Sequence, residues 1–134
     1  MVGCAVLLLS LWVTPTPAQQ SEAAVLISQG ILAYDDKRYA EALSLFTEAL
    51  QRDPESVEAQ YYLGLVQLAQ LQPARAVESL EKARAKAPQD PLINFQLGVA
   101  YFTLEQYDKA EPLLTAVFAA QPKLEGLGYY VGFM

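Results

Sequence analysis

The sequence predicts an all-α fold, a right-handed α-solenoid of stacked helix-turn-helix repeats. Glycines recur every 34 residues, at Gly30, Gly64, Gly98 and Gly132, and alanines and prolines recur with the same period. Within each 34-residue unit, two stretches place their apolar residues at the spacing of one helix face. A period of 34 residues is typical of paired helices, so these observations together predict the solenoid.

The second unit illustrates how each element is recognised. Val57, Tyr61 and Leu65 mark the apolar face of its first helix, Pro73 suits the first position of its second helix, and Pro88 ends that helix. Applied to the whole chain, the same pattern predicts a last helix that begins near residue 125 and, before it, helices over residues 23–36, 39–52, 57–70, 73–86, 91–104 and 107–120.

Small residues at matching positions let the two helices of a unit approach closely. In the second unit these are Gly64, Ala76 and Ala83. Pro112 departs from the pattern because it lies about one turn inside its helix, where it removes a backbone donor and is expected to bend the helix slightly.

The residues that recur with the 34-residue period resemble the pattern of the tetratricopeptide repeat. That pattern runs from a large residue through Leu-Gly, Tyr, Ala, a large apolar residue and Ala to Pro. In the third unit the matching residues are Phe95, Leu97, Gly98, Tyr101, Tyr107, Ala110, Leu114, Val117 and Pro122. In the first unit Gln29 stands where Leu is usual, and the matches are Leu26, Gly30, Tyr39, Ala42, Phe46, Ala49 and Pro54. The resemblance covers about residues 23–134, and it implies the solenoid fold more specifically than any one function.

The repeat register divides the chain into segments. We expect a signal peptide over 1–18, a short linker over 19–22, three full repeats over 23–56, 57–90 and 91–124, and the start of a fourth, truncated repeat over 125–134. Terminal repeats normally carry a polar cap, whereas the last unit is apolar. We therefore expect a fragment of a longer chain; the alternative is a short helix that covers the last pair.

The N-terminal segment predicts export. Val2 to Val13 is almost entirely apolar, which is too short for the roughly 20 residues of a membrane span but fits the roughly 7–15 residues of a signal peptide. Thr16 and Ala18 suit a cut before Gln19, although no Lys or Arg precedes the apolar run. Such a signal would send the chain to the bacterial periplasm or the medium, outer-membrane association included. The alternatives are a buried apolar helix and an uncleaved anchor.

Composition argues against several classes of function. The chain has 9 basic and 15 acidic residues, no histidine and one cysteine. An acidic chain does not suit nucleic-acid binding, and without histidine the usual general base and zinc ligand are missing. Asp35, Asp36 and Glu58 form no convergent acid-base pair in the sequence. We expect no enzyme activity, no cofactor, no metal and no small-molecule substrate.

The resemblance implies that first helices line a concave groove that binds the partner. The predicted groove residues are Ile27, Ile31, Tyr34, Glu58, Tyr61, Tyr62, Leu65, Leu92, Phe95, Gln96, Val99 and Phe102. No Lys or Arg falls in a predicted first helix, so the basic grip on a peptide's terminal carboxylate that chaperone-binding members use is not expected. Tyr101 and Tyr107 are expected in the core.

The leading hypothesis is therefore a non-catalytic protein-protein interaction scaffold of the bacterial cell envelope. Its partner would be a protein or peptide with an apolar or amphipathic segment, and an acidic peptide would not suit the groove. Contact with the membrane is expected only through the transient signal peptide. The alternative is the repeat region of a larger enzyme or of an outer-membrane or export protein, where it positions another domain.

Overall fold

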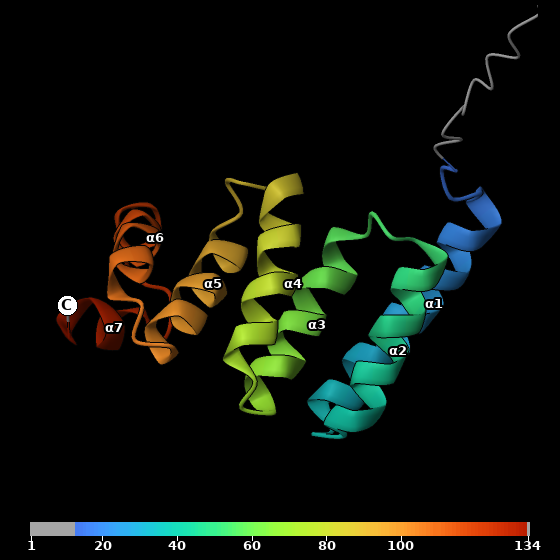
Figure 1. Cartoon of the computed structure of the whole chain (residues 1–134), viewed down its shortest axis with the longest axis horizontal. Helices are drawn as coiled ribbons and strands as arrows, with labels where there is room; N and C mark the ends of the chain where they lie inside the picture. The colour runs from blue at the N-terminus through green and yellow to red at the C-terminus, as the bar shows by residue number, and fades with distance from the viewer. Residues whose placement is uncertain (1–12, 134) are drawn as a thin grey trace, which may run out of the picture.

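The computed structural model describes residues 13–133, which form seven α-helices and no strand (Figure 1). The helices are α1 (Pro17–Asp35), α2 (Tyr39–Arg52), α3 (Val57–Ala69), α4 (Pro73–Lys86), α5 (Pro91–Thr103), α6 (Tyr107–Ala120) and α7 (Leu127–Phe133). The predicted all-α solenoid is confirmed, and the observed bounds of α2 to α6 agree with the predicted ones to within one residue. None of the helices in this part of the chain is long and apolar enough to cross a membrane.

The first helix is longer than the sequence pattern predicts. It begins at Pro17, because the Thr16 hydroxyl oxygen accepts a hydrogen bond from the backbone amide of Gln19 and the Gln19 side-chain oxygen accepts one from the backbone amide of Thr16, which makes a capping box. The predicted linker over 19–22 is therefore helical. Residues 1–12 of the predicted signal peptide lie outside the described residues, and the predicted cut before Gln19 falls in the first turn of α1.

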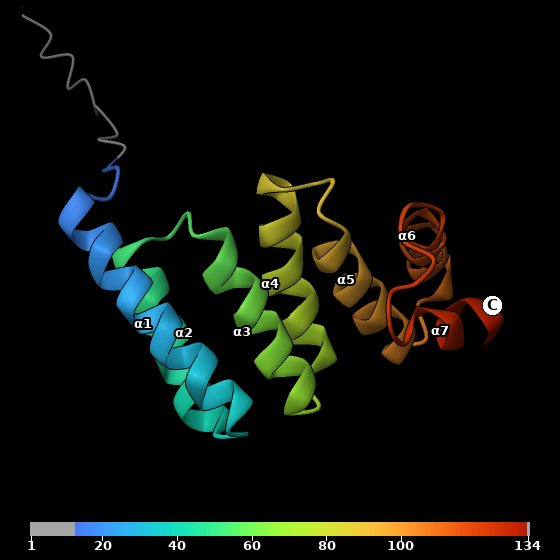
Figure 2. The same cartoon turned by 180° about the vertical axis from the view of Figure 1, so that it is seen from behind.

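The helices stack as antiparallel pairs along one axis (Figures 1 and 2). Each second helix packs against its own first helix and against the first helix of the next pair. The first helices also contact one another in the order α1, α3, α5, α7, whereas neighbouring second helices α2, α4 and α6 make no such contact. The first helices therefore lie on the inner, concave side of the stack.

A glycine in each of α1, α3 and α5 admits a large side chain from the second helix of the same pair. Phe46, Leu80 and Leu114 are fully buried, and each lies directly against Gly30, Gly64 or Gly98 of its own pair. The alanines of the repeat pattern, which include Ala42, Ala76 and Ala110, are buried around them. The periodic small residues thus mark the places where the two helices of each pair meet, as the sequence predicts.

The turns between paired helices are also periodic. Lys37, Leu71 and Glu105, which are 34 residues apart, all have φ close to +60°. The amide of each donates to the carbonyl three residues earlier, and the next amide donates to the carbonyl five residues earlier, for example Arg38 to Ala33. These bonds form a Schellman motif, which ends α1, α3 and α5 in the same geometry.

Candidate functional site: the concave face

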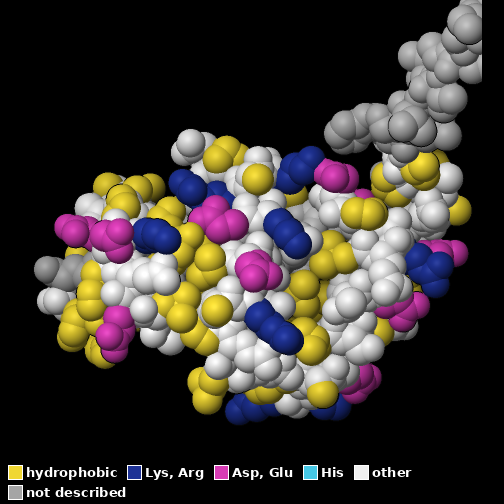
Figure 3. Space-filling model, in the orientation of Figure 1, with side chains coloured by type: hydrophobic (Ala, Val, Ile, Leu, Met, Phe, Trp, Pro, Cys, Tyr) yellow, Lys and Arg dark blue, Asp and Glu magenta, His cyan; other side chains and the backbone are white. Residues whose placement is uncertain are grey.

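The concave face lacks positive charge. None of the first helices α1, α3, α5 and α7 contains Lys or Arg, and all nine basic residues of the chain lie in second helices or connecting segments. Figure 3 shows the side on which α2 and α4 lie in front, where Lys and Arg alternate with Asp and Glu. Cations are therefore confined to the turns and the second-helix side, as expected from the sequence.

The predicted groove residues differ in how far they reach solvent. Ile27 and Phe95 are only 5% and 8% exposed, and each belongs to a cluster of core residues. Glu58 is exposed and Leu92 is 46% exposed. The remaining predicted residues are half-buried: Ile31, Tyr34, Tyr61, Tyr62, Leu65, Gln96, Val99 and Phe102.

Tyr62 is the centre of an aromatic group at the N-terminal end of the groove. Its ring stacks on Phe46 at 5.5 Å between centroids and meets Tyr61 and Tyr34 edge-on at 5.3 and 6.4 Å. Tyr39 lies beside Tyr34 at 5.8 Å. Edge-to-face rings at these distances favour one another beyond the area they bury. Tyr62 is therefore both a packing residue and part of the accessible surface.

Phe102 is the centre of a second aromatic group at the C-terminal end. Its ring lies 5.0 to 5.3 Å from those of Tyr107, Tyr130 and Phe133, edge-on in each case. Tyr107 was expected in the core, but it is 41% exposed because it lies at the start of α6, beside the rim of the groove. Tyr107 of α6 thus lies beside the groove, together with Tyr130 and Phe133 of α7.

A cavity of about 310 Å³ opens between α3 and α5. We call it the tyrosine cavity; its walls are Val57, Glu58, Tyr61, Tyr62, Asp90, Leu92 and Ile93. Asp90 is the N-cap of α5: its Oδ1 accepts from the amides of Leu92 and Ile93 at 2.9 and 3.3 Å. Its place in the groove follows from the contact between α3 and α5, which a sequence pattern within one unit does not report.

The tyrosines of this region hold their protons more tightly than free tyrosine. Burial, followed by the charges of Tyr62, Asp90 and Tyr34, raises the pKa of Tyr61 to about 12. Burial, followed by Glu58 and Asp35, also raises the pKa of Tyr62. The carboxylates thus lie close enough to the tyrosine hydroxyl groups to oppose their ionisation.

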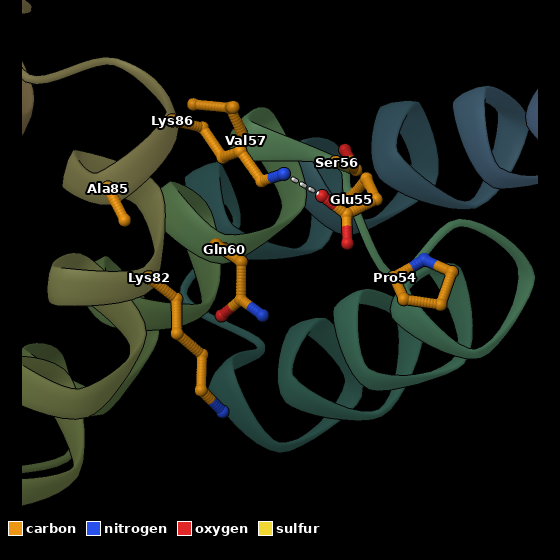
Figure 4. Close-up of a pocket in the computed structure, with 8 residues that line it drawn as sticks. All are labelled: Pro54, Glu55, Ser56, Val57, Gln60, Lys82, Ala85 and Lys86. Atoms are coloured by element: carbon orange, nitrogen blue, oxygen red, sulfur yellow. Dashed lines mark ion pairs between the residues drawn. The ribbon is translucent and has the colours of Figure 1, made fainter. Parts of the chain in front are cut away.

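The second-helix side has cavities of a different character. One, shown in Figure 4, is lined by Glu55, Gln60, Lys82 and Lys86 among others, and Lys86 pairs with Glu55. In another, the Tyr101 hydroxyl donates to Glu81 at 2.8 Å, and Arg84 donates to Asn94 at 3.1 Å. Positive and negative groups thus occur together on this side, in contrast to the concave face.

Nothing in the described part of the chain resembles a metal centre, because no three His, Cys, Asp or Glu residues of residues 13–133 converge. The half-exposed apolar and aromatic surface of the concave face is instead the kind of arrangement that binds another polypeptide.

Two family models of the tetratricopeptide repeat match this chain, one over residues 27–91 and the other over residues 67–126. The chain belongs to the tetratricopeptide repeat family. Among curated proteins, it is 30% identical over 88 residues to cell division cycle protein 27 homolog A of Arabidopsis thaliana and 30% identical over 90 residues to the photosystem I assembly protein Ycf3 of a Synechococcus strain. These matches cover 66% and 65% of this chain but only 12% and 52% of those proteins.

Solved structures share the fold. The chain is 27% identical to MamA of Desulfovibrio magneticus, with a TM-score of 0.78 over 86% of this chain and 65% of that one. It is 18% identical to the first repeat domain of the Spaghetti protein (RPAP3) bound to an HSP90 peptide, with a TM-score of 0.80 over 85% of this chain and 90% of that one. At this identity the second likeness concerns the fold alone.

Proposed function

We propose that this chain is a non-catalytic scaffold that binds an amphipathic segment of a partner protein along its concave face. The observation that carries the proposal is the surface of the first helices, which is apolar and aromatic, half-exposed and free of Lys and Arg. Burial of such surface stabilises a complex by about 25 cal/mol per Å², from which the cost of association is subtracted.

Support for polypeptide binding comes from the family. The similar repeat domain of the Spaghetti protein is bound to a peptide in its solved structure. In this chain the first helices offer no basic side chain to an acidic peptide. We therefore propose a partner segment with an apolar face and no excess of negative charge.

Selection from a library of random 12-residue peptides, followed by titration of the recovered peptides, tests this proposal. We expect Leu92→Ala and Phe102→Ala to weaken binding by about 2 kcal/mol each, if each side chain is an anchor in the groove. Because Phe102 is half-buried, its variant is first checked for unchanged helicity and melting temperature. The matched control is Lys82→Glu on α4, which should leave affinity unchanged. Binding that is lost with Lys82→Glu and kept with Leu92→Ala and Phe102→Ala would place the ligand on the second-helix side and refute the proposal.

We also propose that the chain acts after export, in the bacterial cell envelope. The support is the apolar N-terminal segment followed by Thr16 and Ala18 before Gln19. A cut there would remove the Thr16 cap, so α1 of the mature chain would begin near Gln19 with fraying in its first turn. Expression in a Gram-negative host and N-terminal sequencing test this: periplasmic protein that starts near Gln19 supports export, and uncut protein confined to the cytosol contradicts it.

A further inference from the structure

We propose that the tyrosine cavity receives a basic side chain, Lys or Arg, of the segment bound in the groove. The inference rests on the proposed function, and it adds a charge requirement at one defined position of the partner. It is carried by the juxtaposition, in one cavity, of two tyrosine rings, two carboxylates and an apolar wall.

The carboxylates of the cavity have no cationic partner. Neither Glu58 nor Asp90 forms an ion pair with any residue that the structure describes, whereas six ion pairs join other residues of that part of the chain. Asp35 at the end of α1 adds negative charge near Tyr62. With no Lys or Arg on α1, α3 or α5, the negative potential of the cavity is left for a ligand to neutralise.

The uncharged walls suit the rest of a basic side chain. Tyr61 and Tyr62 meet edge-on with centroids 5.3 Å apart, and a tyrosine ring face attracts an ammonium or guanidinium group placed over it. Val57, Leu92 and Ile93 provide an apolar wall, against which the methylene stem of Lys or Arg would pack while its charged end reaches the carboxylates.

Two other cavities in the described part of the chain do not share this character. The cavity of Figure 4 contains Lys82 and Lys86 as well as Glu55, so its charges are already mixed. The cavity beside Tyr101 contains Arg84 and Lys109 together with Glu81 and Asp108. Of the three, the tyrosine cavity alone combines carboxylates with aromatic rings and contains no basic residue.

The chain offers substitutions that remove the charge and keep the fold. Asn caps a helix as well as Asp does, so Asp90→Asn retains the bonds to Leu92 and Ile93. Glu58→Gln changes an exposed side chain only. The matched control is Glu78→Gln with Glu111→Gln, which removes the same charge from exposed positions on α4 and α6.

The primary test is titration of the whole chain with N-acetyl-arginine amide. Binding is monitored by NMR through the backbone amide resonances of Val57, Tyr61 and Leu92. N-acetyl-citrulline amide is the neutral isostere, and N-acetyl-lysine amide is compared with its norleucine equivalent. We expect the basic probes to shift these resonances and to bind at least fivefold more tightly than the neutral ones. The double variant of Glu58 and Asp90 should lose at least fivefold, the control pair should not, and added salt should weaken binding. Equal shifts with the neutral probes, no shifts, or unchanged affinity of the double variant would overturn the proposal.

The peptide library separates this inference from the proposed function. Both the proposed function and the cavity inference are supported if the selected peptides bind in the groove, carry Lys or Arg preferentially at one position, and lose that preference when selected on the double variant. Groove-binding peptides without such enrichment leave the proposed function intact and overturn the cavity inference. If no peptide binds while the arginine probe still shifts the cavity resonances, the proposed function fails and the basic subsite stands.

Discussion

Gly64 of α3 and Leu80 of α4 are packed so closely that any other residue in place of the glycine would have to displace the Leu80 side chain. A Cβ at Gly64 would lie 2.6 Å from Leu80 Cγ and 2.8 Å from its Cδ2. The Leu80 side chain is fully buried, and because protein interiors are close-packed it can move aside only at a cost in packing. The same relationship joins Gly30 to Phe46 and Gly98 to Leu114, so the periodic glycines record a steric requirement.

We therefore predict that Gly64→Ala destabilises the chain although alanine favours helix more than glycine does. Overpacking costs roughly 1–3 kcal/mol, and about 1 kcal/mol of helix propensity offsets it, so we expect the free energy of unfolding to fall by up to about 2 kcal/mol. Urea denaturation followed by circular dichroism measures the change.

Gly132→Ala is the control for this substitution. Gly132 has the same place in the repeat pattern, but nothing lies within 4 Å of a Cβ built there, so we expect no loss of stability. In a chain that already carries Leu80→Ala, the further change Gly64→Ala should cost much less than it does in the original chain, because the clashing side chain is gone. Equal effects at Gly64 and Gly132 would contradict the steric account.

The left-handed turns give a second prediction. Leu71 has φ +59° and is 87% exposed, so its side chain contributes little packing while its backbone is strained. Leu71→Gly relieves the strain and should raise the free energy of unfolding by about 0.5–1 kcal/mol, part of the relief being lost to the greater freedom of glycine in the unfolded chain. Leu71→Ala keeps the strain and should change nothing; a gain as large with alanine would point to the lost apolar surface instead.

A buried polar pair gives a third prediction. The Ser79 hydroxyl donates to Oε1 of Gln67 at 2.8 Å, and both side chains are buried between α3 and α4. Ser79→Ala leaves that oxygen without its donor and should cost about 1–3 kcal/mol of stability. Gln67→Leu together with Ser79→Ala should cost less than Ser79→Ala alone, because no polar group is then left unpaired. The reverse order in denaturation experiments would show that the pair matters through shape only.

The raised tyrosine pKa values make stability depend on alkaline pH. Burial, followed by the hydrogen bond to Glu81, raises the pKa of Tyr101 to about 12, and the pKa of Tyr61 is also about 12, against 10.0 in the unfolded chain. Between pH 10 and 12 the folded chain holds these protons and the unfolded chain releases them, so stability is complete below pH 10 and falls as pH rises toward 12. We expect denaturation midpoints to decline over this range, and less steeply in Tyr61→Phe and Tyr101→Phe. Parallel declines in both variants would contradict the assignment.

The fold was predictable because it depends on contacts that recur in every unit. The periodic glycines, alanines and prolines located α2 to α6 to within one residue, since each marks a contact or a helix end inside one unit. The start of α1 was not predicted, because residues 17–22 lie before the first repeat and were assigned to a signal peptide and linker. The signal for it was local: the Thr16–Gln19 capping box.

The groove was predictable only in outline. Periodicity indicates which helix a residue belongs to, but exposure depends on how neighbouring units pack. Ile27 and Phe95 point into core clusters, and Tyr107 lies half-exposed beside Phe102 and Phe133. Asp90 joins the tyrosine cavity because α5 lies beside α3, which no single unit reveals.

Each helix pair of this stack touches only the pair before it and the pair after it, and α1 does not contact α5. Unfolding can therefore begin at either end and stop at a pair boundary, which makes partly unfolded states accessible in the free chain. A ligand that lies along the groove contacts first helices from pairs that do not contact one another. Binding should thus join the pairs into one cooperative unit, so that hydrogen exchange, graded from pair to pair in the free chain, becomes uniform in the complex.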